Sequence, residues 1–188
     1  MTSVDPTAIS LPDNLRPRDG RFGSGPSKVR SDQVAALAAV ADDYLGTSHR
    51  KPAVKQQVAR LQDGLAELFT LPEGYQVVLG LGGATAFWEV ATFGLVDRCV
   101  QALSFGEFGS KFAKAAQTAP WVECTDIITS EPGSAPQFAA ADGIDVYGTP
   151  HNETSTGVMV DVQRPTGASA AALHLVDATS AAGGVAVD

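Results

Sequence analysis

A glycine-rich turn at residues 79–85 is the first segment whose residue types can do chemistry. It reads Leu-Gly-Leu-Gly-Gly-Ala-Thr, follows an apolar run that predicts a strand, and precedes a pattern that predicts a helix. Glycines let a backbone approach a ligand closely, and the free N–H groups at a helix start bind anions with support from the helix dipole. The turn therefore indicates a phosphate cradle to which Thr85 adds a hydroxyl donor. A tight strand-to-helix turn without a ligand explains the same residues as well.

A dinucleotide site is another interpretation of this turn. Gly80, Gly82 and Thr85 approximate the G-x-G-x-x-G fingerprint, but the third glycine is missing. The next predicted strand ends in Ser104 and Phe105, with no acidic residue to bind a ribose hydroxyl. The match is therefore partial.

Two other groups of polar residues also lend themselves to more than one interpretation. Asp177 ends a predicted strand, and ligands of open α/β sheets gather at such ends, although an aspartate there also caps turns. His151 and Glu153 suggest an H-x-E metal or deaminase site. The chain has no P-C-x-x-C partner for such a site, so we expect no metal.

The elements that must position these residues follow from the apolar periodicity. A helix capped by Ser31 and running to residue 45, and a second from Pro52 to Phe69, come first. Short apolar runs then alternate with helical patterns, which predicts an α/β chain with parallel strands and crossover helices. The predicted strands are 76–81, 99–104, 121–125, 144–149 and 172–176, and the predicted helices are 85–96 and 107–118. Residues 130–143 and 161–170 are predicted to be surface loops or weak helices, and a further strand is predicted to begin near Val185.

The composition excludes several classes of protein. The chain has 188 residues, 44% of them hydrophobic and 18% charged, as is usual for a water-soluble globular protein. The net charge is −8, and the 13 Lys and Arg residues are scattered, so we expect no nucleic-acid partner. No apolar run reaches the roughly 18–20 residues of a membrane span, and no secretory signal is recognisable, so we expect a cytoplasmic protein.

Two smaller expectations concern the cysteines and the beginning of the chain. Cys99 and Cys124 lie in apolar stretches without metal-ligand spacing, which favours two buried, reduced thiols. Residues 1–20 contain three prolines among polar residues and are predicted to be an extended or mobile arm.

In their order along the chain, these segments resemble those of the fold-type I aminotransferases that use pyridoxal 5'-phosphate, and within them the class V phosphoserine aminotransferases. The resemblance implies that the glycine turn holds the cofactor phosphate and that Asp177 pairs with the ring nitrogen. It implies that Phe108, where relatives carry Trp, stacks on the ring. The residues of the turn that match the family are Gly83, Ala84 and Thr85.

Two more segments extend the resemblance, which runs from Phe22 over nearly the whole chain. Residues 150–154 resemble the family's Pro-Asn-Glu-Thr segment, whose Thr, here Thr154, hydrogen-bonds the ring hydroxyl. Residues 48–50 resemble a Ser-His-Arg segment that helps to bind the substrate phosphate across a dimer interface, which assigns this role to His49 and Arg50. Without the resemblance, a solvated charge on a loop is the better interpretation of Arg50, since exposed arginines are common.

The resemblance implies the N-terminal half of such an enzyme. Residues 21–188 are then part of a three-layer α/β/α large domain with a mostly parallel sheet. We expect the rest of that domain, the small domain and the covalent cofactor lysine to lie beyond Asp188, and the 188 residues alone to be an inactive fragment. The full enzyme would be a homodimer that transfers an amino group between glutamate and 3-phosphohydroxypyruvate in serine biosynthesis, forming phosphoserine and 2-oxoglutarate. An alanine-glyoxylate type of aminotransferase and a Rossmann-type nucleotide-binding module are the alternatives.

Overall fold

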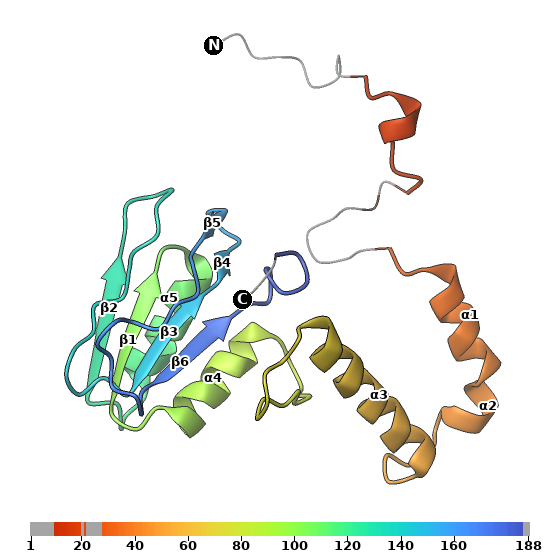
Figure 1. Ribbon diagram of the computed structural model, residues 1–188, viewed down its shortest axis with the longest axis horizontal. Helices are drawn as coiled ribbons and strands as arrows, with labels where there is room; N and C mark the ends of the chain where they lie inside the picture. Colours follow the sequence, from red (N-terminus) through yellow and green to blue (C-terminus); the bar gives the residue numbers. More distant parts are fainter. Residues whose placement is uncertain (1–9, 20, 22–27, 186–188) are drawn as a thin grey trace. The chain divides into compact units, whose positions relative to one another are not determined.

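A computed structural model describes residues 10–19, 21 and 28–185 (Figure 1). The chain divides into two compact units, Met1–Leu61 and Gln62–Asp188, and the boundary falls inside a helix. Residues 22–27, where the resemblance begins, lie outside the described residues, as do residues 1–9 and 20 of the predicted arm and residues 186–188 of the strand predicted to begin near Val185.

The first unit is helical. A 3-10 turn, Asp13–Leu15, precedes α1 (Ser31–Ala39), α2 (Ala41–Tyr44) and α3 (Pro52–Leu68), and α3 continues into the second unit. The predicted first helix is therefore split, because the backbone of Val40 leaves the helical region at φ −113° and ψ 11°. Pro52 begins α3 as expected, since a proline suits the first helical turn. In the described part of the chain, no helix is long and apolar enough to cross a bilayer.

The second unit is built on a parallel sheet. Its strands are β1 (Cys99–Ser104), β2 (Cys124–Thr129), β3 (Val146–Pro150) and β6 (Leu173–Asp177), in the order β2-β1-β3-β6 with every pair parallel (Figure 1). A separate antiparallel hairpin joins β4 (Asn152–Glu153) to β5 (Val158–Met159). The predicted α/β class with a parallel sheet is confirmed.

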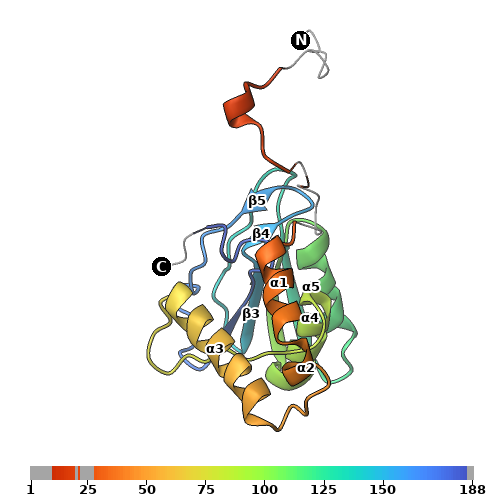
Figure 2. The same ribbon diagram turned by 90° about the vertical axis from the view of Figure 1, so that its right-hand side faces the viewer.

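Two helices, α4 (Ala84–Leu95) and α5 (Glu107–Thr118), cover one face of this sheet (Figure 2). Their apolar sides meet β1 and β3 in a core in which the rings of Trp88 and Phe112 stack with centroids 4.1 Å apart. Phe112 lies so close to Gly148 of β3 that an added β-carbon would overlap its ring. A side chain at position 148 would therefore push α5 off the sheet.

Irregular segments cover the other face of the sheet. Phe138 packs edge-on against Tyr147 of β3, and Ala168 joins the same cluster. The carboxamide of Gln101 in β1 hydrogen-bonds both the N–H and the carbonyl of Ala139. The predicted loops at 130–143 and 161–170 are confirmed.

The strand predicted at residues 76–81 is wrong. This segment makes no strand, and Val78 and Leu81 are 81% and 100% exposed. An apolar run forms a strand when another strand offers it an edge, and the described residues give it no such partner. Its carbonyl at Val77 instead accepts a hydrogen bond of 2.7 Å from the Gln62 side chain.

Strand β2 is displaced from the predicted strand 121–125. It begins at Cys124 rather than residue 121 because Trp121 turns back onto α4, where its ring lies 4.6 Å from that of Phe93. The apolar character of Trp121 and Val122 thus serves helix packing rather than strand pairing.

The expectation of two buried, reduced thiols is also wrong. Cys99 and Cys124 form a disulfide, and Cys124 is exposed. The parallel register of β1 and β2 places the two residues opposite each other. Pairing between strands separated by a helix is a tertiary property that cysteine spacing does not reveal.

Asp145 organises the start of the sheet at the end opposite the strands' carboxyl termini. Its carboxylate accepts hydrogen bonds from the backbone N–H groups of Asp97 (2.6 Å), Arg98 (3.2 Å) and Cys99. Its own backbone bonds both neighbouring strands, because Asp145 N–H donates to Cys99 O and Leu173 N–H donates to Asp145 O. The side chain therefore joins the turn before β1 to the strand beside it.

Replacing Asp145 with alanine should lower the free energy of unfolding by about 1–3 kcal/mol, because backbone donors lose their acceptor. Asp142→Ala, which changes an exposed loop carboxylate, is the matched control and should stay within about 0.5 kcal/mol of the wild type. Urea denaturation measures both variants, and equal stabilities would contradict the role of Asp145.

His174 of β6 should make the stability depend on pH. Burial, with a smaller contribution from the positive charge of Arg164, lowers its pKa below the ordinary 6.5. The unfolded chain therefore binds a proton at a pH where the folded protein does not, so this contribution to stability is complete above pH 6.5 and is lost as pH falls toward the lowered pKa.

His174→Gln should flatten the loss of stability below pH 6.5 in urea unfolding curves recorded at several pH values. His49→Gln, at an exposed histidine, is the control and should leave the wild-type dependence unchanged. The same slope in His174→Gln as in the wild type would refute the assignment.

Candidate functional site

The carboxyl ends of the parallel strands meet at one edge of the sheet, and three of the predicted site segments lie there. β6 ends at Asp177, which pairs in register with Pro150 at the end of β3. β1 ends at Ser104, so α5, which begins at Glu107, starts from the same edge and carries Phe108 in its first turn. This edge is where open α/β sheets bind their ligands.

The glycine turn reaches the same edge through the direction of α4. This helix ends three residues before β1 begins, so it runs antiparallel to the strand. A 12-residue helix is about 18 Å long and a six-residue strand about 20 Å, so the start of α4 returns to the strands' carboxyl ends. In Figure 1 the start of α4 lies at the same end of the sheet as the arrowhead of β6.

The backbone before α4 requires glycine. Gly82 has φ +94°, and an added β-carbon would lie 2.7 Å from that of Ala86. Gly83 is the N-cap and has no side chain with which to cap the helix. Since the first N–H groups of a helix have no partner within it, the start of α4 offers backbone donors together with the positive end of the helix dipole.

Asp177 is 7% exposed and belongs to the turn that follows β6. Its Oδ1 accepts a hydrogen bond of 3.0 Å from the N–H of Thr179, which is the turn-capping interaction that the sequence left open. A carboxylate has several acceptor positions, and this bond uses one of them. The turn and a ligand can therefore share the same aspartate.

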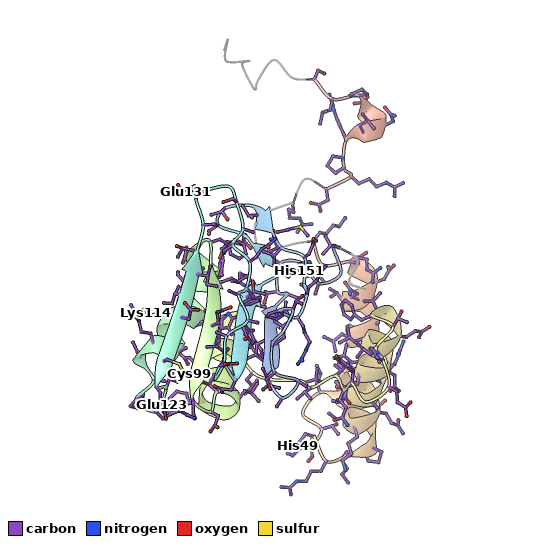
Figure 3. All side chains as sticks on the ribbon, turned by 60° about the vertical axis from the view of Figure 1, so that its left-hand side comes forward. His49, Cys99, Lys114, Glu123, Glu131 and His151 are labelled. Atoms are coloured by element: carbon purple, nitrogen blue, oxygen red, sulfur yellow. A yellow bond between two sulfur atoms is a disulfide. The ribbon has the colours of Figure 1, made fainter. Side chains whose placement is uncertain are left out.

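His151 directly follows β3 (Figure 3). It carries a buried ring nitrogen without a partner among the described residues. The backbone N–H of His151 donates to the carbonyl of Asp177 at 2.9 Å. The residue is only 6% exposed, and the ring nitrogen Nδ1 has no hydrogen-bond partner. An unpaired buried nitrogen costs free energy, which is recovered when a polar ligand group approaches it. Sequence reasoning weighed His151 for a metal alone, although its place directly after a strand end pointed to the ligand edge.

Phe108 is half-buried in the first turn of α5. The ammonium group of Lys111 lies 4.7 Å from the centre of its ring. The backbone N–H of Phe108 donates to the carboxylate of Glu153, which the sequence suggested only as part of an H-x-E metal pattern and not as a partner of this helix. Thr154, next in the chain, is exposed in the turn between β4 and β5.

His49 and Arg50 belong to the first unit, in the connection between α2 and α3 (Figure 3). Both side chains are exposed. The hydroxyl of Ser48 accepts the N–H of Arg50 at 3.3 Å, and the carbonyl of Ser48 accepts the N–H of Lys51 at 2.9 Å. These bonds shape the loop so that the guanidinium group is presented to solvent. The structure therefore gathers the elements of the other six predicted residues at one edge and leaves these two in a different unit.

A cavity of about 400 Å³ lies on the loop-covered face of the sheet. The residues that line it include Leu103, Thr149, Phe138, Met159 and Arg164. None of the predicted site residues lines this cavity, so the cavity is not part of the predicted site.

Comparison with known proteins relates the chain to one group of enzymes. The phosphoserine aminotransferase of Nocardioides sp. is 57% identical over 182 residues, which are 96% of this chain and 49% of that protein. The solved phosphoserine aminotransferase of Cytophaga hutchinsonii is 25% identical, with a TM-score of 0.71 over 87% of this chain and 46% of its own. A phosphoserine aminotransferase from Trichomonas vaginalis with bound pyridoxal phosphate shares the fold, with a TM-score of 0.69, 17% identity and coverage of 82% of this chain and 49% of its own.

No family model matches the chain. The predicted resemblance is nevertheless confirmed, because the sequence and structure comparisons agree on the same relatives. The chain is a homologue of the phosphoserine aminotransferases over nearly its whole length, and it spans about half the length of the curated relatives it matches.

Proposed function

We propose that the protein to which this chain belongs is a phosphoserine aminotransferase, which transfers an amino group between glutamate and 3-phosphohydroxypyruvate with pyridoxal 5'-phosphate as cofactor. The observation that carries the proposal is the shared edge of the sheet. The start of α4, an anion-binding backbone, and Asp177, a buried carboxylate, lie at the same end of the parallel strands. A cofactor with a phosphate at one end and a basic ring nitrogen at the other is complementary to this pair.

The residues present fit such a cofactor. The backbone at Gly83, Ala84 and Thr85 would hold the phosphate, since a helix start without a side-chain cap offers free N–H donors. Asp177 would accept a hydrogen bond from the ring nitrogen, and its carbonyl is bonded by the backbone of His151, whose buried Nδ1 has no partner among the described residues. Because a buried nitrogen is seldom left without a hydrogen-bond partner, Nδ1 of His151 supports the binding of a polar ligand group near it.

Two further residues would complete the cofactor site. The half-exposed ring of Phe108 offers an aromatic surface at the start of α5. The exposed hydroxyl of Thr154 offers a hydrogen bond to the ring hydroxyl of the cofactor.

The aspartate performs the main electrostatic task. When bound, pyridoxal phosphate supplies an electron sink for the α-carbon of the substrate. The negative charge of Asp177 would keep the ring nitrogen protonated, because an opposite charge within hydrogen-bond distance favours the charged form of a base. We assign the lysine that holds the cofactor covalently to the part of the relatives that this chain does not span.

The exposed loop before α3 would recognise the substrate. Arg50 presents a planar, permanently charged group that binds a phosphate with two parallel hydrogen bonds, and His49 adds a donor. We propose that the enzyme is a homodimer in which this loop serves the site of the partner, as the resemblance of residues 48–50 to the Ser-His-Arg segment implies. We further propose that the enzyme is cytoplasmic.

Asp177→Asn tests the cofactor assignment most cleanly. Asparagine keeps an oxygen for the N–H of Thr179 and so preserves the turn, but it removes the charge. The dissociation constant for pyridoxal phosphate should rise about tenfold or more, since a hydrogen bond to a charged group contributes ~1.5–3 kcal/mol. Titration of the full-length protein, followed by cofactor absorbance, measures it. Asp142→Asn is the control, and unchanged affinity in Asp177→Asn would refute the pairing.

Arg50→Ala tests the substrate. In the full-length protein, KM for 3-phosphohydroxypyruvate should rise about tenfold or more, because a charge-assisted contact to the phosphate is lost. KM for glutamate, which has no phosphate, should change little. Arg60→Ala, an exposed arginine of α3, is the matched control. A KM for the phosphorylated keto acid that stays at the wild-type value would contradict the assignment.

A further inference from the structure

We propose that Glu153 is a positioning residue that fixes the start of α5, and with it Phe108, at the carboxyl edge of the sheet. The inference rests on the proposed function, since it concerns how the cofactor site is held in shape. Glu153 ends β4, the first strand of the hairpin, 45 residues from Phe108 along the chain, and its side chain is fully buried.

The start of α5 lacks a cap of its own. Its N-cap is Gly106, which has no side chain, and the first N–H groups of a helix find no partner within it. The hairpin segment supplies the missing acceptors. Oε2 of Glu153 accepts the N–H groups of Phe108 at 3.0 Å and Gly109 at 2.9 Å, and the hydroxyl of Ser155 accepts that of Glu107 at 2.9 Å.

The other carboxylate oxygen is also satisfied. Oε1 of Glu153 accepts the hydroxyl of Ser155 at 2.7 Å and its N–H at 3.3 Å. All of these partners donate, which suits a carboxylate that accepts at both oxygens. A buried charge is costly unless it is compensated, and here the compensation comes from four donors and from the positive end of the α5 dipole.

Glycines bring the two segments close enough for this arrangement. A β-carbon added at Gly106 would overlap the side chains of Glu153 and Ser155. One added at Gly109 would lie 2.6 Å from the carbonyl oxygen of Leu103. These close contacts place the carboxylate of Glu153 directly against the start of α5.

The same short segment is bonded to the opposite side of the proposed cofactor site. His151 N–H donates to the carbonyl of Asp177 at 2.9 Å, and the amide of Asn152 donates to the hydroxyl of Ser180 at 2.9 Å. Residues 151–155 therefore connect the turn that carries Asp177 to the helix start that carries Phe108. Glu153 thus sets the spacing between the ring-stacking residue and the partner of the ring nitrogen.

Hydrogen exchange in the full-length protein without cofactor tests the contact itself. In Glu153→Ala, the amides of Phe108 and Gly109 should exchange about tenfold or more faster, because they lose a charged acceptor. Glu153→Gln keeps one carbonyl oxygen and should lie between alanine and the wild type. If Glu153→Ala does not fold, Ser155→Ala replaces it, with faster exchange expected at Glu107. Glu131→Gln, at an exposed glutamate, is the matched control and should match the wild type.

Cofactor titration of the same variants separates positioning from plain structural support. The dissociation constant for pyridoxal phosphate should rise in the same order as the exchange rates. Faster exchange with unchanged affinity would make Glu153 a structural cap and overturn the proposal, as would unchanged exchange. A wild-type protein that takes up no pyridoxal phosphate would instead contradict the proposed function, and with it this inference, whatever the exchange rates of the variants.

Discussion

The parallel pairing of β1, β3 and β6 is the constraint on which the rest of the second unit depends. Because every strand runs in the same direction, each chain segment that leaves a strand emerges at one edge. The helices must then return antiparallel, so their positive dipole ends gather at that edge as well. Backbone donors and a buried carboxylate come together there without any need for proximity in sequence. The chemistry proposed for the protein follows from this geometry.

Buried polar groups at this edge are satisfied across elements rather than within them. Glu153 caps a helix that it does not precede, and the backbone of His151 bonds that of Asp177 in the neighbouring strand. Each such bond fixes the distance between two segments, which is what a binding site for a rigid aromatic molecule requires. Nδ1 of His151 is the exception at this edge, and it points to a ligand because a buried nitrogen is seldom left without a partner; elsewhere in the described residues, Nε1 of Trp88 and Nε2 of His174 also have no partner.

The sequence predicted those features that depend on local periodicity. β1 and α5 were placed within a residue, since an apolar run and an amphipathic helix are encoded by neighbouring residues. The predictions from sequence were wrong where pairing between segments distant in the chain determines the structure. Residues 76–81 have the composition of a strand without a partner among the described residues, and Cys99 meets Cys124 through strand register. The sequence suggested Glu153 only as a metal ligand and not as a helix cap, because its donors, Phe108 and Gly109, lie 45 and 44 residues away.

The most direct test of the account is a crystal structure of the full-length protein with pyridoxal phosphate. We expect the phosphate to lie within about 3.2 Å of backbone N–H groups at the start of α4, and the ring nitrogen at a similar distance from the carboxylate of Asp177. A phosphate bound elsewhere, or a ring nitrogen directed away from Asp177, would contradict it.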